Sequence, residues 1–221
     1  MLDKAIIAEL EALAGKTNVL TGTVDRLTYS YDATADVPRQ MPDVVVLPTD
    51  TAMVQALVRF ARERRIPIYP RGAGTNLSGG TVPLKQGIVL SFQKMNAILD
   101  IDPANLTAVV QPGVVIGALN AAVAPHGLIY PPDPGTVATA TMGGSAAENS
   151  GGLRGLKYGV TKNYIMGMEV VLANGEKVRF GGKTVKNVTA YDFGTLFIGS
   201  EGTLGIITKA TLKLLPKPKY A

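Results

Sequence analysis

Three separated glycine-rich segments constrain this chain more than any other feature of its sequence. They lie at residues 70–80, 131–152 and 199–208, and each mixes glycine with small polar residues. Closely spaced glycines open backbone conformations that are closed to other residues, so several amide N–H groups can point into one concavity. Concavities of this kind bind anions, most often phosphates. The three segments are therefore the first candidates for a ligand site.

The first segment runs from Pro70 to Gly80 and has four glycines within nine positions. Thr75 and Asn76 add hydrogen-bonding side chains beside them. A Rossmann fingerprint would need a third glycine at position 77, which is leucine. A P-loop starting at Gly74 would need lysine at position 80, which is glycine. The first segment therefore fits neither motif. We interpret it as an anion-binding loop of another kind, and the alternative is a tight loop that binds no ligand.

The second segment begins with a rigid Pro131–Pro134 entry and continues through two Gly-Gly pairs to residue 152. The small residues between these pairs let backbone approach a flat ligand closely. In the third segment Glu201 sits between two glycines ahead of an apolar run, where its carboxylate can accept hydrogen bonds from ribose hydroxyls. A turn-stabilising surface acid is the alternative for Glu201. Three separate loops suit an extended dinucleotide better than a small substrate.

Composition excludes several other chemistries. The chain has no cysteine, which removes thiol catalysis and iron–sulfur ligation, and its single histidine, His126, provides no metal-binding cluster. The net charge of +5 comes from scattered residues, and the densest basic cluster, at 59–65, ends an apparent helix where cations complement the helix dipole. We therefore expect no nucleic-acid partner. No apolar run approaches the roughly 20 residues of a membrane helix, and we expect the chain in the cytoplasm, or at a membrane through a partner.

Hydrophobic periodicity predicts an α+β fold. Helices are expected at 2–14, from Thr49 or Asp50 to about residue 64, and at 116–124, with a helical turn at 145–149. Strands are expected at 44–47, 66–70, 88–92, 97–102, 106–111, 166–172 and 177–180, and a last strand is expected over 204–208 and 210–215. The first two strands and the helix between them predict a parallel βαβ unit. We expect one domain over 1–221, with a small parallel subdomain at 30–100 and a larger, mostly antiparallel α+β subdomain with flanking helices at 101–215.

Taken in order, the three segments resemble the FAD-binding domain of the vanillyl-alcohol-oxidase (PCMH) type. They are most similar to the branch that contains the FAD-linked subunit of glycolate oxidase and the D-lactate and D-2-hydroxyacid dehydrogenases. The resemblance runs from about Tyr31 to Leu215.

This resemblance implies a role for each loop. The first would wrap the pyrophosphate of FAD through backbone amides, the second would border the adenine-side channel and then the flavin and ribityl chain, and the third would hold the adenosine ribose. The implied cofactor-binding residues are Pro70, Gly72, Ala73, Gly74, Thr75, Asn76, Gly79, Gly80, Pro132, Asp133, Pro134, Gly143, Gly144, Ser145, Asn149, Gly152, Glu201, Gly202, Gly205 and Ile207. The resemblance assigns no catalytic residue and no metal ligand within the chain.

Some members of this family attach FAD covalently through a histidine of the first loop. The matching position here is Thr75, and His126 follows an expected helix, so the resemblance implies non-covalent FAD. Family enzymes also carry a second large domain, a cap that binds the substrate, and we expect that domain to be absent from these 221 residues.

The implied activity is oxidation of a 2-hydroxy acid of the glycolate or D-lactate type to the 2-keto acid. Electrons would leave for an electron-transfer flavoprotein, an iron–sulfur subunit or a quinone. Two alternatives remain from the sequence. One is a stand-alone FAD-binding subunit of a multi-chain oxidoreductase. The other is a flavoprotein similar to UDP-N-acetylenolpyruvoylglucosamine reductase, which shares the Gly-x-Gly-[Ser/Thr]-Asn loop.

Overall fold

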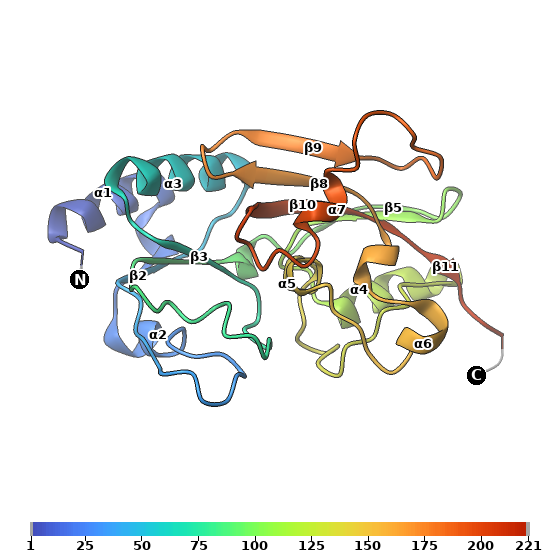
Figure 1. Ribbon diagram of the computed structural model, residues 1–221, viewed down its shortest axis with the longest axis horizontal. Helices are drawn as coiled ribbons and strands as arrows, with labels where there is room; N and C mark the ends of the chain where they lie inside the picture. Colours follow the sequence, from blue (N-terminus) through green and yellow to red (C-terminus); the bar gives the residue numbers. More distant parts are fainter. Residues whose placement is uncertain (1, 220–221) are drawn as a thin grey trace. The chain divides into compact units, whose positions relative to one another are not determined.

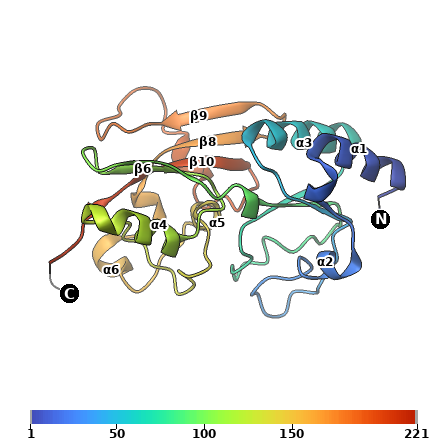
Figure 2. The same cartoon turned by 180° about the vertical axis from the view of Figure 1, so that it is seen from behind.

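The computed structural model describes residues 2–219 and divides them into two compact units (Figures 1 and 2). The first unit covers the chain up to Met95 together with Val171–Lys177. The second covers Asn96–Val170 and the chain from Val178 onward. The two subdomains expected from the sequence, at 30–100 and 101–215, stay a prediction.

The first unit contains a sheet with strand order β1-β2-β4-β3. Its elements are α1 (Lys4–Ala14), β1 (Val19–Leu20), α2 (Thr23–Leu27), β2 (Val44–Val46), α3 (Thr51–Arg64), β3 (Ile68–Arg71) and β4 (Ile88–Ser91), with 3-10 turns at Lys16–Asn18 and Phe92–Lys94. β2 and β3 both run parallel to β4, which lies between them, while β1 is antiparallel to β2. The expected βαβ unit is therefore present, but with a later strand inserted between its two strands.

The two long helices of this unit begin and end where their capping residues predict. Asp3 caps α1 by accepting a hydrogen bond from the amide of Ile6 at 2.8 Å. Asp50 caps α3 in the same way through Met53, at 2.9 Å. α3 stops at Arg65, which adopts the left-handed conformation with φ 54°. Asp and Asn side chains satisfy amides that the first helical turn leaves without partners, which explains both starting points.

The second unit contains an antiparallel sheet with strand order β5-β6-β10-β8-β9. Its elements are β5 (Ile98–Asp102), β6 (Thr107–Val110), α4 (Ile116–Val123), β7 (Leu128–Ile129), α5 (Met142–Glu148), α6 (Gly155–Tyr158), β8 (Ile165–Leu172), β9 (Lys177–Gly181), α7 (Gly194–Phe197), β10 (Gly205–Lys213) and β11 (Leu215–Pro216), with 3-10 turns at Ala124–His126 and Thr161–Asn163. Its core packs one sheet face against α4 and α5, around the fully buried Tyr130, Leu119 and Leu212. The β8–β9 hairpin turns through Asn174-Gly175, with Gly175 at φ 80°, as the sequence predicts, and its tip at Val171–Lys177 is counted with the first unit.

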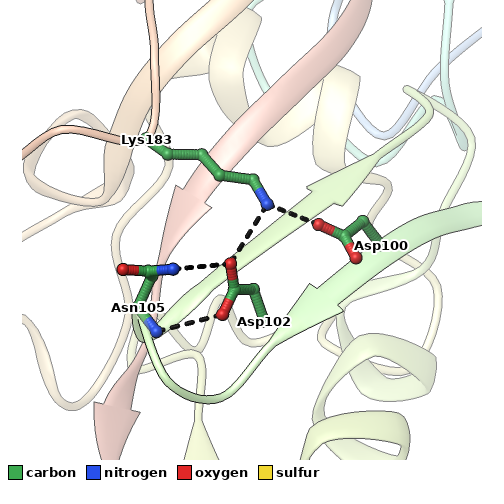
Figure 3. A network of polar contacts seen from close by, with 4 residues as sticks. All are labelled: Asp100, Asp102, Asn105 and Lys183. Carbon is green, nitrogen blue, oxygen red and sulfur yellow. Dashed lines mark hydrogen bonds and ion pairs between the residues drawn. The ribbon is translucent and has the colours of Figure 1, made fainter.

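A polar network fastens the segment after β9 to strand β5 of the same unit (Figure 3). The Lys183 ammonium donates to Asp100 at 2.6 Å and to Asp102 at 3.3 Å, while Asn105 donates to Asp102 through its amide nitrogens. Hydrogen bonds from Asn105 and Lys183 lower the pKa of Asp102, and the hydrogen bonds that Lys183 donates to the carboxylates of Asp100 and Asp102 raise the pKa of Lys183. All three charged groups face water, so this network orients the segment more than it stabilises the fold.

The start of α5 differs from the sequence-based expectation. The expected helical turn at 145–149 is part of α5, which starts three residues earlier because Thr141 accepts a hydrogen bond from the amide of Gly144. The last strand expected over 204–208 and 210–215 is present as β10, which runs without a break from Gly205 to Lys213. None of the helices within residues 2–219 has the length and apolarity that crossing a bilayer requires.

Candidate functional site

The first glycine-rich segment leaves the carboxyl end of β3, the usual place for a ligand loop in a parallel sheet. Pro70 is still in β3, and residues 72–80 form an irregular loop that includes Gly74 at φ 70° and Gly79 at φ 74°. In the described part of the chain, the backbone amides of residues 72–75 donate no hydrogen bond to protein. A short run of amides without protein partners is what an anion needs.

Arg71, which the sequence analysis did not select, fills the inside of this loop. Arg71 is 7% exposed, and its guanidinium donates to the carbonyl of Tyr31 at 2.7 Å and to the hydroxyl of Thr81 at 3.4 Å. A Cβ added at Gly74 would collide with that guanidinium. Burial lowers the pKa of Arg71, and the negative charge of Asp32 opposes the shift.

Asp32 is a second residue that no sequence motif marked. Asp32 is 9% exposed, and its carboxylate accepts hydrogen bonds from the amide of Thr34 at 2.9 Å, from the side chain of Asn76 at 2.8 Å and from the hydroxyl of Thr81 at 3.1 Å. The Asn76 side chain, expected beside the pyrophosphate, is therefore engaged with protein. Asp32 and Asn76 lie 44 residues apart, which no periodicity connects.

The stabilisation that the Asp32 carboxylate contributes to the fold depends on pH. Burial would raise its pKa, but the hydrogen bonds from Thr34, Asn76 and Thr81 outweigh burial and hold the pKa below its ordinary value. Such a carboxyl stabilises the fold above its unfolded pKa, about 4, and the contribution is lost as pH falls through the lower folded pKa. We expect the difference in unfolding free energy between wild type and Asp32→Asn to shrink below about pH 4. Urea unfolding across that range measures it, and a constant difference would contradict the assignment.

Asp133, near the start of the second segment, contacts Gly152 and Arg154 at its other end and so holds the two ends together. Its carboxylate accepts a hydrogen bond from the amide of Arg154 at 2.9 Å and pairs with the Arg154 guanidinium at 3.3 Å. A Cβ added at Gly152 would overlap the carbonyl oxygen of Asp133. Pro132 and Pro134 are buried on either side of Asp133. The structure therefore brings the expected adenine-side residues of 132–134 against Gly152.

The glycines at the start of α5 have packing roles of their own. Gly143 donates its amide to the carbonyl of Pro112 at 2.8 Å, and a Cβ at Gly143 would collide with the Pro112 ring. Ser145, on the next turn, is 3% exposed, and within the described residues its hydroxyl has no hydrogen-bond partner. A buried hydroxyl without a partner costs about 1–3 kcal/mol. It is therefore a group that a bound ligand can satisfy.

The third segment packs against the end of α5. The amide of Gly199 donates to the carbonyl of Ala146 and the amide of Glu201 to that of Ala147, both at 2.9 Å. Asn149 caps α5 at φ 49°, and its side chain accepts from the amide of Lys162 at 3.0 Å. Glu201 is exposed in a turn with φ 52°.

Of the remaining predicted residues, Gly202 adopts φ 76° in the same turn, and Gly205 and Ile207 are buried in β10. The second and third segments thus meet within the second unit, whereas the first segment belongs to the first unit. His126 is exposed at the end of its 3-10 turn. Among the described residues there is no group of three or more His, Asp or Glu side chains that could hold a metal ion.

These features fit FAD on observations of the structure itself. In the first unit, the unpartnered amides of residues 72–75 suit a diphosphate. In the second unit, taken by itself, the buried hydroxyl of Ser145 lacks a protein partner and suits a polar ligand atom. A family model described as an FAD binding domain matches residues 42–181, which is more than half of the chain. The chain belongs to this family of FAD-binding domains. The expected α+β fold and the expected FAD cofactor are thereby confirmed.

Curated relatives place this FAD-binding domain more narrowly. It is 52% identical over 219 residues to "Glycolate oxidase subunit GlcD" of Bacillus subtilis, a match that covers 99% of this chain and 46% of the relative. It is 47% identical over 192 residues to "D-lactate dehydrogenase" of Archaeoglobus fulgidus, covering 86% of this chain and 43% of the relative. The chain thus spans about half the length of the curated relatives it matches.

Solved structures agree on the fold of the FAD-binding domain. An alkyldihydroxyacetonephosphate synthase matches 99% of this chain and 41% of its own, with a TM-score of 0.88 and 25% identity. A p-cresol methylhydroxylase with substrate bound matches 97% of this chain and 44% of its own, with a TM-score of 0.84 and 28% identity. Individual contacts between the predicted site residues and FAD stay predictions.

Proposed function

We propose that the chain is the FAD-binding domain of a flavin-dependent dehydrogenase that oxidises a 2-hydroxy acid to the 2-keto acid. The observation that carries this proposal is the 52% identity, over almost the whole chain, to a protein named as a glycolate oxidase subunit, together with the D-lactate dehydrogenase relative. When bound, FAD supplies the acceptor for the hydride equivalent that leaves the hydroxyl-bearing carbon.

The chain's own residues would bind and orient that cofactor. The amides of residues 72–75 would hold the diphosphate without needing a side-chain charge. Ser145 and the Gly143–Gly144 turn would face the remaining cofactor, and the Asp133–Gly152 closure would keep the second segment in shape. Glycolate and D-lactate are the substrates we propose for the whole enzyme, because these are the compounds in the relatives' names.

We further propose that FAD is held without a covalent bond, because Thr75 stands in the first loop and the single histidine, His126, lies exposed in the second unit. Electrons would pass to a separate acceptor, for which an electron-transfer flavoprotein, an iron–sulfur subunit and a quinone are the candidates. The Bacillus subtilis relative is itself named as a subunit, which supports an assembly with other chains. The location we propose is the cytoplasm, or a membrane through such a partner.

Cofactor binding can be tested on the 221-residue chain. Reconstitution should give a yellow protein with one FAD per chain, and acid precipitation should release all of that FAD into the supernatant. Flavin that stays with the precipitated protein would contradict non-covalent attachment. A chain that takes up no FAD at all would contradict the proposed function itself.

The substrate class requires the second half of a relative. In a hybrid, this chain would replace the matching half of the Bacillus subtilis protein, whose FAD-binding half it resembles at 52% identity. Glycolate or D-lactate added without oxygen should bleach the flavin of the hybrid, as it should in the unaltered relative. A hybrid that binds FAD fully but stays yellow with both acids, while the relative is bleached, would contradict the 2-hydroxy-acid proposal.

A further inference from the structure

Residues 29–37 contain no helix or strand and lie outside the region, 42–181, that matches the family model. In the structure this segment nonetheless contacts the first glycine-rich loop repeatedly. We name residues 29–37 the platform segment. Both the platform segment and the loop belong to the first unit, so the contacts between them are defined.

Asp32 is the main contact of the platform segment with the loop. Its two carboxylate oxygens accept three hydrogen bonds, of which those from the Asn76 side chain and the Thr81 hydroxyl come from the loop region. The third comes from the amide of Thr34 and keeps the carboxylate oriented. One carboxylate oxygen of Asp32 thus accepts from both Asn76 and Thr81, while the other accepts from Thr34 within the platform segment.

Thr34 makes the second contact, and its hydroxyl bonds to backbone atoms of the loop. Its hydroxyl accepts a hydrogen bond from the amide of Gly79 at 2.7 Å and lies 3.4 Å from the carbonyl of Asn76, to which it donates. Gly79 has φ 74°, and a Cβ there would come within 3.3 Å of the Val37 side chain. One threonine hydroxyl therefore joins the two ends of the 76–79 turn.

Arg71 holds the other end of the loop to the same segment. Its guanidinium donates to the carbonyl of Tyr31 and lies 5.4 Å from the centre of the Tyr29 ring. The Tyr29 side chain in turn packs on the core cluster formed by Val45, Leu47 and Val89. The platform segment is thereby anchored in the sheet of the first unit.

These contacts leave a distinctive pattern of satisfied and unsatisfied groups. The Asn76 side chain and the Gly79 amide are bound to the platform segment, whereas the amides of residues 72–75 have no partner within the described chain. We propose that the platform segment, with Asp32 and Thr34 as positioning residues, holds the loop in its diphosphate-binding shape before the cofactor arrives. This inference rests on the proposed function, in which residues 72–75 bind the FAD diphosphate.

A loop fixed in advance loses less conformational entropy when its ligand binds, so its affinity depends on the platform segment. Thr34→Val removes the hydroxyl at nearly constant shape, and we expect it to weaken the binding of FAD and of ADP by the same factor, about five- to tenfold. Thr34→Ser keeps the hydroxyl and should restore both affinities. Adenosine, which lacks the diphosphate, should bind wild type and Thr34→Val equally. Titrations with each ligand measure these affinities.

Thr28→Val is a matched control, because the Thr28 hydroxyl is exposed and bonds only to the carbonyl of Asp25, outside the platform segment. It should bind FAD and ADP as wild type does. If ADP and FAD bind wild type but bind Thr34→Val equally well, the platform proposal is wrong while the proposed function stands. If neither binds wild type, the diphosphate assignment itself fails.

Hydrogen exchange on the unaltered chain tests the same proposal without a variant. Without ligand, the Gly79 amide should be protected and the amides of residues 72–75 should exchange quickly, whereas ADP should slow exchange at residues 72–75. Rapid exchange at Gly79 in the ligand-free chain, as fast as at residues 72–75, would overturn the proposal, because the loop would then not be held in advance.

Discussion

Gly74→Ala should weaken FAD binding by at least about tenfold, which corresponds to ~1.4 kcal/mol of binding free energy. Gly74 has φ 70°, a conformation that costs other residues about 1–2 kcal/mol. The added methyl group would also meet the buried guanidinium of Arg71, which is tied to Tyr31 and Thr81. Either the loop or Arg71 has to move, and both changes disturb the amides that we assign to the diphosphate. Flavin fluorescence titration measures the affinity.

Gly182→Ala is the control, because a Cβ at Gly182 meets no atom within 4 Å. Gly182 also lies outside the three glycine-rich segments. Its FAD affinity should equal that of wild type. A double-mutant cycle with Arg71→Ala separates the two causes, because without the guanidinium only the backbone cost of Gly74→Ala remains. Equal FAD affinities of wild type and Gly74→Ala would show that residues 72–75 do not bind the cofactor.

The parts of the fold that could be predicted from the sequence are those governed by local patterns. Periodic apolar residues and capping aspartates gave α1 and α3 within two residues of their bounds, and Asn174-Gly175 gave the β8–β9 turn. Strands of two residues, such as β1 and β7, carry no period and were missed. The position of β4 between β2 and β3 was missed as well, because strand order depends on long-range pairing that local patterns do not encode.

In the candidate site too, local sequence patterns predicted some features and missed others. Glycine spacing located the three loops, because a backbone that turns sharply needs glycine at defined positions. It could not say what each glycine is for: Gly143 makes room for Pro112, whereas Gly74 makes room for Arg71. Nor could it find Asp32, since the bond from Asn76 to that carboxylate spans 44 residues and lies in a segment without regular structure. Such residues are visible only once the chain is folded.

Gly152→Ala should have the second large effect, a loss of about 1–3 kcal/mol in the free energy of unfolding. The new Cβ would overlap the carbonyl oxygen of Asp133, and backbone cannot turn aside as a flexible side chain does. Separating these residues would also break the bond from the amide of Arg154 to the Asp133 carboxylate. Residues 131–154 should then be cut faster by protease, and FAD affinity should fall with them, because the second segment loses its closure.

Gly155→Ala is a stringent comparison for this result, because it adds the same methyl group three residues later, where no atom lies within 4 Å. It should leave stability unchanged or slightly raised, since alanine restricts the unfolded chain more than glycine does. Urea unfolding and limited proteolysis of both variants, with and without FAD, measure the two effects. Should Gly152→Ala unfold and be cut like Gly155→Ala, the contact between Gly152 and Asp133 would not be what closes the second segment.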